Sequence, residues 1–134
     1  MKYFTIAELS KSATAKRLKV SNVPTQYVKD NLVELVNNIL DPLREAWGAP
    51  IIVSSGYRCP CVNRAVGGAK YSQHMYGQAA DIHTVSDKPE DNKKLFNLIQ
   101  KLKLPYDQLI DEYGYNWIHV SYGPRNRRQI LHIN

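Results

Sequence analysis

The chain has 134 residues, of which 43% are hydrophobic and 22% are charged, a balance typical of a folded globular protein. This length suits one domain with one hydrophobic core, so we expect a single domain over residues 1–134. No apolar run approaches the ~18–20 residues that a membrane helix requires, which predicts no membrane span. The net charge of +6 favours anionic partners, or simply keeps a small domain in solution.

The N-terminus, from Met1 to Glu8, lacks the long apolar centre and small-residue cleavage site of a signal peptide. We therefore expect synthesis in the cytoplasm. Residence there, export by another route and a leader missing from this sequence stay open. Residues 6–18 predict a short helix, which Thr5 caps and Glu8 supports as its capping-box partner.

The strongest helical pattern runs from Pro24 to Trp47. Asp41-Pro42 is expected to kink or restart this helix, because proline cannot donate a backbone hydrogen bond. Gly48 is expected to end it. The apolar residues recur at steps of three and four and predict one buried stripe, made of Val28, Leu32, Leu35, Val36, Ile39, Leu43 and Trp47.

A short β-branched run, Ile51 to Val53, predicts a buried strand. Residues 54–77 predict a long loop that holds four of the seven glycines, and a loop of this length in a compact domain is usually functional. Cys59 and Cys61 lie in it, only one residue apart. That spacing strains a disulfide and differs from the spacing of zinc-binding cysteine pairs, so we expect two reduced thiols.

The second half of the chain predicts mostly strands with one helix between them. Helices first and then strands indicate an α+β fold rather than a regular βαβ array. The predicted elements are a strand over residues 78–83, an amphipathic helix over 90–102, a hairpin of two central strands at 108–111 and 117–122, and an edge strand at 129–133.

Three residues in this region have the chemistry of a metal site. His74 and Asp81 meet if a tight turn at Gly77 leads into the strand that carries Asp81. His119 shares one strand face with Trp117, because strand side chains alternate. Two imidazoles and one carboxylate leave a fourth position open for water, as in catalytic zinc sites. The same residues also suit hydrogen-bonded core or surface positions, so spacing alone leaves both interpretations open.

Several blocks of sequence together resemble the peptidase M15 family. They occur in the family's order between about Ile51 and Tyr122 and comprise Ser55-Gly56-Tyr57-Arg58, Asn63-Arg64-Ala65-Val66-Gly67-Gly68, Ser72-x-His74-x-x-Gly77-x-Ala79-x-Asp81 and Trp117-Ile118-His119-Val120-Ser121. This family contains zinc D-Ala-D-Ala carboxypeptidases, D-Ala-D-Ala dipeptidases and L-Ala-D-Glu endopeptidases of phage lysins. The resemblance implies the hedgehog/DD-peptidase fold, an α+β fold with helices on one face of a small antiparallel sheet.

The resemblance also implies roles for individual residues. It makes His74, Asp81 and His119 the ligands of one Zn²⁺ per chain. Arg58 is expected to hold a substrate carbonyl or carboxylate and to oppose negative charge in the transition state. Ser72 is expected to bind substrate or to orient its loop, although a turn-capping serine explains its position equally well. Asn63 and Arg64 are expected to fix the loop.

The sequence offers two acids as candidates for the catalytic base. Several relatives carry an acid three residues before the last histidine ligand, and this chain has Asn116 there, which cannot accept a proton usefully. The stretch from Gln108 to Glu112 is similar to a branch of the family in which the Gln and the Glu recur. We therefore expect Glu112 to be the base, with Asp111 as the alternative.

Two further histidines, His83 and His132, are not expected to be ligands. His83 shares a strand face with Asp81, so it is a candidate for contact with a ligand.

The function implied is zinc-dependent hydrolysis of a peptide bond in the stem peptides of bacterial peptidoglycan, of the D-Ala-D-Ala carboxypeptidase or the L-Ala-D-Glu endopeptidase type. The alternative is a non-catalytic zinc-containing module of the same fold that binds cell wall or a protein, and Asn116 favours it. No nucleic-acid-binding motif is present, so no such partner is expected. We expect a monomer that acts on the cell wall.

Overall fold

The structure, a computed structural model, describes residues 1–134. Its centre is a five-stranded sheet in the order β1-β2-β4-β3-β5. The strands are β1 (Ile51–Ser55), β2 (Ala79–Thr84), β3 (Gln108–Glu112), β4 (Trp117–Ser121) and β5 (Gln129–Ile133). Helices and a separate, mostly antiparallel sheet confirm the expected α+β class.

One strand pair departs from the expected antiparallel sheet. The edge strand β5 runs parallel to β3, whereas the other neighbours are antiparallel. The reason lies in the connection. After β4 the chain crosses the start of β3 and returns on its far side, so β5 must run in the direction of β3.

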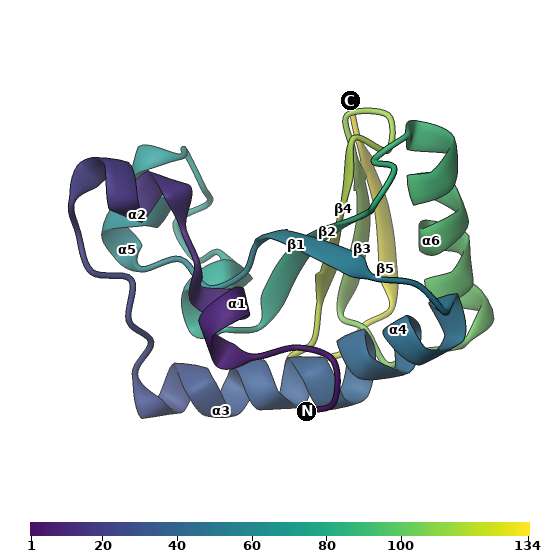
Figure 1. Ribbon diagram of the computed structural model, residues 1–134, viewed down its shortest axis with the longest axis horizontal. Helices are drawn as coiled ribbons and strands as arrows, with labels where there is room; N and C mark the ends of the chain where they lie inside the picture. Colours follow the sequence, from purple (N-terminus) through teal and green to yellow (C-terminus); the bar gives the residue numbers. More distant parts are fainter.

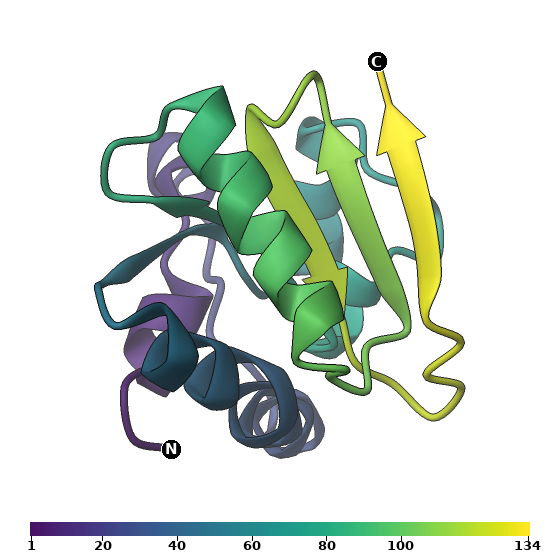
Figure 2. The same ribbon diagram turned by 90° about the vertical axis from the view of Figure 1, so that its right-hand side faces the viewer.

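The helix α6 (Pro89–Lys101) covers one face of the sheet (Figure 2). Alternation along the strands turns Ile82, Ile118 and Val120 toward this helix, where they join Leu95 and Ile99 in one buried cluster. The residues between them, Asp81 and His119 among them, therefore face the other side of the sheet. The sheet thus has an apolar face for stability and a polar face for chemistry.

The predicted long helix begins at Gln26, two residues after Pro24, and is continuous to Trp47 (Figure 1). Thr25 caps α3 (Gln26–Leu35), which passes through a π-helical turn, η1 (Val36–Leu40), into α4 (Asp41–Trp47). The helix is not broken before Pro42. It widens there into a π-helical turn with one extra residue, in which Asp41 N donates to Val36 O. Gly48 ends the helix as expected. The predicted stripe is buried, except for the half-buried Trp47.

The expected helix over residues 6–18 is two helices, α1 (Ile6–Ser10) and α2 (Ala13–Leu18). Thr5 caps α1 through Glu8 N, as predicted. Lys11 is extended, and the Ser12 hydroxyl accepts a hydrogen bond from Ala15 N at 3.0 Å, which starts a new helix. A polar capping residue within the pattern therefore divides it. No helix of the structure has the length and apolar character needed to cross a membrane.

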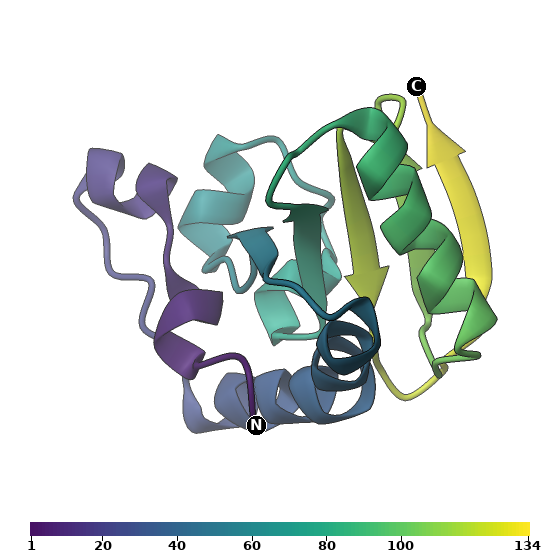
Figure 3. The ribbon, with the colours of Figure 1, turned by 45° about the vertical axis from the view of Figure 1, so that its right-hand side comes forward.

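The segment expected to be a long loop contains two short helices, α5 (Pro60–Ala65) and η2 (Gln73–Tyr76). They lie between the N-terminal helices and the sheet, opposite α6 (Figure 3). Helices therefore cover both faces, and not one face as the family resemblance implied. Gly77 has a φ of 72°, and a Cβ there would lie 2.6 Å from Val28 O. Only glycine permits this turn from η2 into β2.

Candidate metal centre and its cavity

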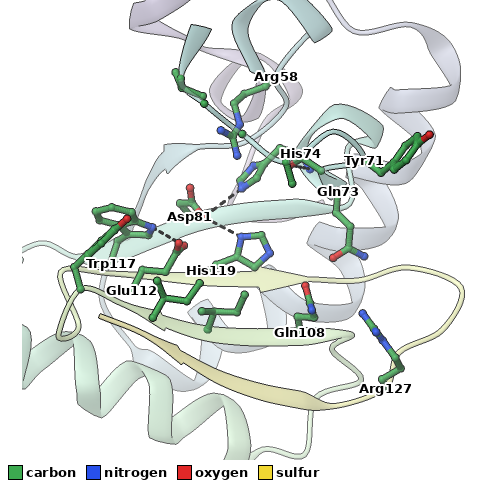
Figure 4. Close-up of a pocket in the computed structure, with 18 of the residues that line it drawn as sticks. Arg58, Tyr71, Gln73, His74, Asp81, Gln108, Glu112, Trp117, His119 and Arg127 are labelled. Carbon is green, nitrogen blue, oxygen red and sulfur yellow. Dashed lines mark hydrogen bonds and ion pairs between the residues drawn. The ribbon is translucent and has the colours of Figure 1, made fainter. Parts of the chain in front are cut away.

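The polar face of the sheet and the segment that contains α5 and η2 enclose a cavity of about 620 Å³. Its lining includes the six residues expected to bind the metal, to bind substrate or to act as the base: Arg58, Ser72, His74, Asp81, Glu112 and His119. Figure 4 shows Asp81, Glu112 and His119 reaching into the cavity from the sheet, and Arg58 and His74 from the overlying segment. The fold therefore gathers residues that are up to 61 positions apart, from Arg58 to His119.

Strand pairing and one turn bring the three predicted ligands together. Asp81 on β2 and His119 on β4 are direct cross-strand partners, so their side chains stand side by side on the polar face. His74 reaches the same point from η2, on the other wall of the cavity (Figure 4). One nitrogen or oxygen of each residue lies within 4.8 Å of the other two.

The distances between these atoms fit a metal ion. Asp81 Oδ1 lies 3.3 Å from His74 Nε2 and 3.2 Å from His119 Nδ1. Ligand atoms ~2.0–2.2 Å from a tetrahedral zinc are separated by about 3.3–3.6 Å. The imidazole of His74 is only 2% exposed, and its Nε2 has no hydrogen-bond partner. A buried nitrogen without a partner is costly unless it coordinates something. The donor set and its spacing therefore fit Zn²⁺.

The backbone orients the His74 ring. His74 Nδ1 lies 2.7 Å from the carbonyl oxygen of Gly56, which requires the proton on Nδ1 and leaves the Nε2 lone pair directed into the cavity. Gly56 itself is fixed by close packing, because a Cβ there would lie 2.2 Å from Leu9 O. The Ser-Gly-Tyr-Arg block thus supplies a ligand-orienting carbonyl that only glycine permits.

The electrostatics of Asp81 agree with a ligand role. Burial raises the pKa of its carboxyl, but the neighbouring His74 and the hydrogen bond with His119 outweigh burial and hold the pKa well below its usual range. The group is therefore ionised and available as a ligand at neutral pH.

Arg58 points from the overlying segment toward the metal ligands (Figure 4). Burial lowers the pKa of its guanidinium, while the charges of Asp81 and Glu112 raise it. Its Nε is buried without a hydrogen-bond partner. Guanidinium remains charged in proteins, so this is an unpaired donor facing the cavity, suited to a carbonyl or carboxylate oxygen.

Of the two candidates for the base, only Glu112 lines the cavity. Its Oε2 accepts a hydrogen bond from the indole of Trp117 at 2.8 Å. Asp111 faces the other side of β3, where it accepts hydrogen bonds from Tyr115 N and lies 3.0 Å from His132 Nδ1. Asn116 is an exposed turn residue outside the cavity. Strand alternation predicts this division between Glu112 and Asp111.

The remaining sequence candidates have structural contacts. The Ser72 hydroxyl caps η2 through His74 N at 3.2 Å, and Ser72 also lines the cavity. The buried Asn63 bonds Ala69 O and fixes the loop, whereas Arg64 is exposed.

The contact expected between His83 and a ligand is absent. His83 instead lies 2.7 Å from Thr84 O and 3.3 Å from Asp87 Oδ1. The His83 ring thus contacts Asp87, which follows β2, and not Asp81.

Sequence reasoning assigned no role to three contributors to the site. The Gly56 carbonyl is a backbone group, which no residue pattern reveals. Trp117 shares a strand face with His119, so its alternation was the available signal. Asp107 is completely buried beneath the end of the cavity, where it binds Gln73 and Arg127. No local pattern predicts those long-range contacts.

Comparison with known proteins gives two matches. A family profile described as Peptidase M15 matches residues 2–121 of the chain. A zinc D-Ala-D-Ala carboxypeptidase from Streptomyces albus G is 50% identical over 44 residues. That alignment covers 32% of this chain and 17% of the Streptomyces enzyme, so most of the enzyme has no counterpart in the alignment.

Proposed function

The chain belongs to the peptidase M15 family, and we propose that it is a zinc metallopeptidase that hydrolyses a peptide bond in the stem peptides of bacterial peptidoglycan. The bond is of the D-Ala-D-Ala carboxypeptidase or the L-Ala-D-Glu endopeptidase type. The named substrate of the Streptomyces relative supports this substrate class. The protein acts on the cell wall, and its net charge of +6 suits an anionic polymer of that kind.

One observation carries this proposal. A three-ligand His-Asp-His set, a carboxylate held by an indole and an unpaired guanidinium line the same cavity. Structural zinc sites are closed by four protein ligands, whereas three ligands beside an open cavity leave room for water and substrate. A binding module needs neither a positioned carboxylate nor an unpaired arginine at its metal.

The mechanism follows from the positions of the side chains. His74, Asp81 and His119 would hold a zinc ion, which would supply a Lewis acid for the attacking water and for the scissile carbonyl. Glu112 accepts the proton of the attacking water and delivers it to the leaving amine. Arg58 stabilises the oxyanion that develops on the carbonyl or anchors a substrate carboxylate. The Gly56 carbonyl keeps His74 in the required tautomer.

The metal is tested by elemental analysis of protein purified without chelator and then supplied with zinc. One zinc per chain is expected. His74→Ala and His119→Ala should lose it, because each removes one of only three ligands. Wild-type protein that retains no zinc would overturn the metallopeptidase assignment.

The base is tested with a matched pair of amide variants. Glu112→Gln should abolish hydrolysis of muropeptides while zinc remains bound, because the amide cannot accept the proton. Asp111→Asn changes charge equally but on the other face of β3, and it should be nearly silent in activity. If zinc-loaded wild type cleaves neither muropeptides nor D-Ala-terminated peptides, the binding-module alternative replaces the enzyme.

A further inference from the structure

The cavity has two chemically different ends. Glu112 and Trp117 lie at one end and Gln73, Gln108 and Arg127 at the other, with the metal ligands between them (Figure 4). The mechanism above uses the first end and the centre. The second end also receives Arg125, from the segment between β4 and β5, and none of its residues has a role in the mechanism.

The second end is built on the completely buried carboxylate of Asp107. Each of its oxygens accepts two hydrogen bonds. Oδ1 receives Arg127 N at 3.1 Å and Arg127 Nε at 2.8 Å, and Oδ2 receives Arg127 Nη2 at 3.2 Å and Gln73 Nε2 at 3.0 Å. A carboxylate offers about four acceptor positions, so Asp107 is saturated.

Arg125 is the cation left over. Its Nη2 lies 3.7 Å from Asp107 Oδ2, too far for a hydrogen bond, and no other partner is seen for its guanidinium. Asp107 contributes one negative charge, and Arg125 and Arg127 contribute two positive charges, which leaves a net +1 at this end. The adjacent lining residues Tyr71, Gln73 and Gln108 are neutral.

The backbone around Arg125 is fixed in advance. Gly123 N donates to the Asn126 side chain at 3.0 Å, and Arg128 N donates to Tyr106 O at 3.0 Å. Arg125 also lines a shallow depression that adjoins the cavity and contains Tyr27 and Tyr76. The Arg125 side chain is 63% exposed, so its guanidinium lies at the rim shared by the cavity and this depression, where a ligand in the cavity can reach it.

We infer that Arg125 forms a carboxylate subsite at this end of the cavity, so that the preferred substrate carries a free carboxylate on one side of the cleaved bond. This inference rests on the proposed function and names the chemistry that the site selects. A guanidinium with free donors binds a carboxylate through two parallel hydrogen bonds. A stem peptide offers two such groups, the free carboxylate of its D-Glu residue and its terminal carboxylate.

The test compares a stem pentapeptide that begins with L-Ala-D-Glu and ends with D-Ala-D-Ala, and two versions amidated at either carboxylate. In wild type, one amidation should lower kcat/KM about tenfold or more, the effect of losing one charge-assisted contact. Arg125→Gln should show that loss with the free-acid peptide and become indifferent to amidation. Arg125→Lys should recover part of the preference, because it restores the charge without the planar fork.

Arg17→Gln is the control, since it removes one positive charge from an exposed part of α2 outside the cavity. It should keep the wild-type preference. The position of the sensitive amide identifies which carboxylate is bound. Wild type that is indifferent to both amidations, or an Arg125→Gln variant that is as sensitive as wild type, would overturn the inference.

Binding of the three peptides to zinc-loaded Glu112→Gln, measured by calorimetry, separates this inference from the proposed function. Lack of cleavage by wild type would refute the proposed function alone. The subsite is refuted if amidation does not weaken binding to Glu112→Gln, or if adding Arg125→Gln to that variant leaves the weakening unchanged.

Discussion

The indole of Trp117 is the only side chain that donates a hydrogen bond to Glu112, at 2.8 Å. It limits the rotamers of the carboxylate and keeps it facing the metal ligands. Trp117→Phe retains the aromatic contact but removes the donor. We expect kcat to fall about tenfold, with KM and zinc content unchanged, because misplacing a proton acceptor affects the chemical step. Steady-state kinetics with elemental analysis measures this.

Tyr113 provides the matched control, since its ring packs against Trp117 with centroids 5.2 Å apart. Tyr113→Phe keeps the ring contact and the Trp117 donor, so kcat should stay near the wild-type value. An equal fall in both variants, or a Trp117→Phe effect confined to KM, would contradict a positioning role for the indole.

Arg58 is predicted to act on the substrate and not on the metal. Arg58→Ala should lower kcat/KM by ~10²–10³-fold, the usual effect of removing a transition-state donor. Zinc content should be unchanged, because Arg58 is not a ligand. Arg64→Ala, an exposed arginine six residues away, is the control for the loss of charge. Wild-type activity in Arg58→Ala would show that the guanidinium has no role in turnover.

For single residues, the sequence predicted those positions that follow from strand alternation or from the family resemblance. His119 and Trp117 share a face because strand side chains alternate, and Glu112 and Asp111 separate for the same reason. The anchoring of Arg127 on Asp107 joins residues 20 positions apart. Such a contact depends on the path of the chain around β3, which no single-residue pattern contains.

Helices and strands are predicted correctly where apolar residues recur with a regular period. The apolar stripe from Val28 to Leu43 predicted a buried helix, and that helix is observed. Pro42 did not interrupt it, because the π-helical turn before it accommodates the missing donor. The polar caps Ser12 and Ser72 start short helices that a hydrophobic period cannot reveal. Capping chemistry accounts for the departures in residues 6–18 and around η2.

The loop that precedes α5 carries the next prediction. Gly56→Ala places a Cβ against the backbone of Leu9, so the strand end must shift and the Gly56 carbonyl must move away from His74 Nδ1. We expect zinc affinity to fall ~10–100-fold, as is usual when the group that orients a histidine ligand is lost. Competition with a chromogenic chelator measures the affinity.

General destabilisation is separated from this effect by Thr25→Ala, which removes the cap of α3 at a residue that does not line the cavity. That change should lower the free energy of unfolding by ~1 kcal/mol and leave zinc affinity unaltered. If Gly56→Ala binds zinc as tightly as wild type, the carbonyl does not orient the ligand.

In the molecule as a whole, the two faces of the sheet have different roles. The face under α6 holds apolar side chains and stabilises the fold, while the opposite face holds the metal ligands beneath α5 and η2. Asp107 is the link between the parts. It binds Gln73 on η2, Arg127 before β5 and, through its carbonyl, Gln129 N on β5. One buried residue, through its carboxylate and its carbonyl, therefore joins the overlying segment, the start of β3 and the C-terminal strand.

Because the Asp107 carboxylate makes these contacts, the free energy of unfolding is expected to depend on pH. Hydrogen bonds from Arg127 lower the pKa of Asp107, although burial opposes them. A carboxyl whose pKa is lower in the folded than in the unfolded state stabilises the fold fully when the pH is above its unfolded-state pKa of ~3.9. It loses that contribution as the pH falls through its folded-state pKa. Asp107→Asn should therefore cost ~1.5–3 kcal/mol at pH 7 and progressively less below about pH 4. Urea unfolding of zinc-free wild type and zinc-free Asp107→Asn at pH 7 and pH 3 measures this difference. Asp30→Asn, which removes an exposed carboxylate on α3, is the control for the loss of charge. A cost for Asp107→Asn that is the same at both pH values would mean that the charge of Asp107 does not stabilise the fold, and that its contacts with Gln73 and Arg127 act only through shape.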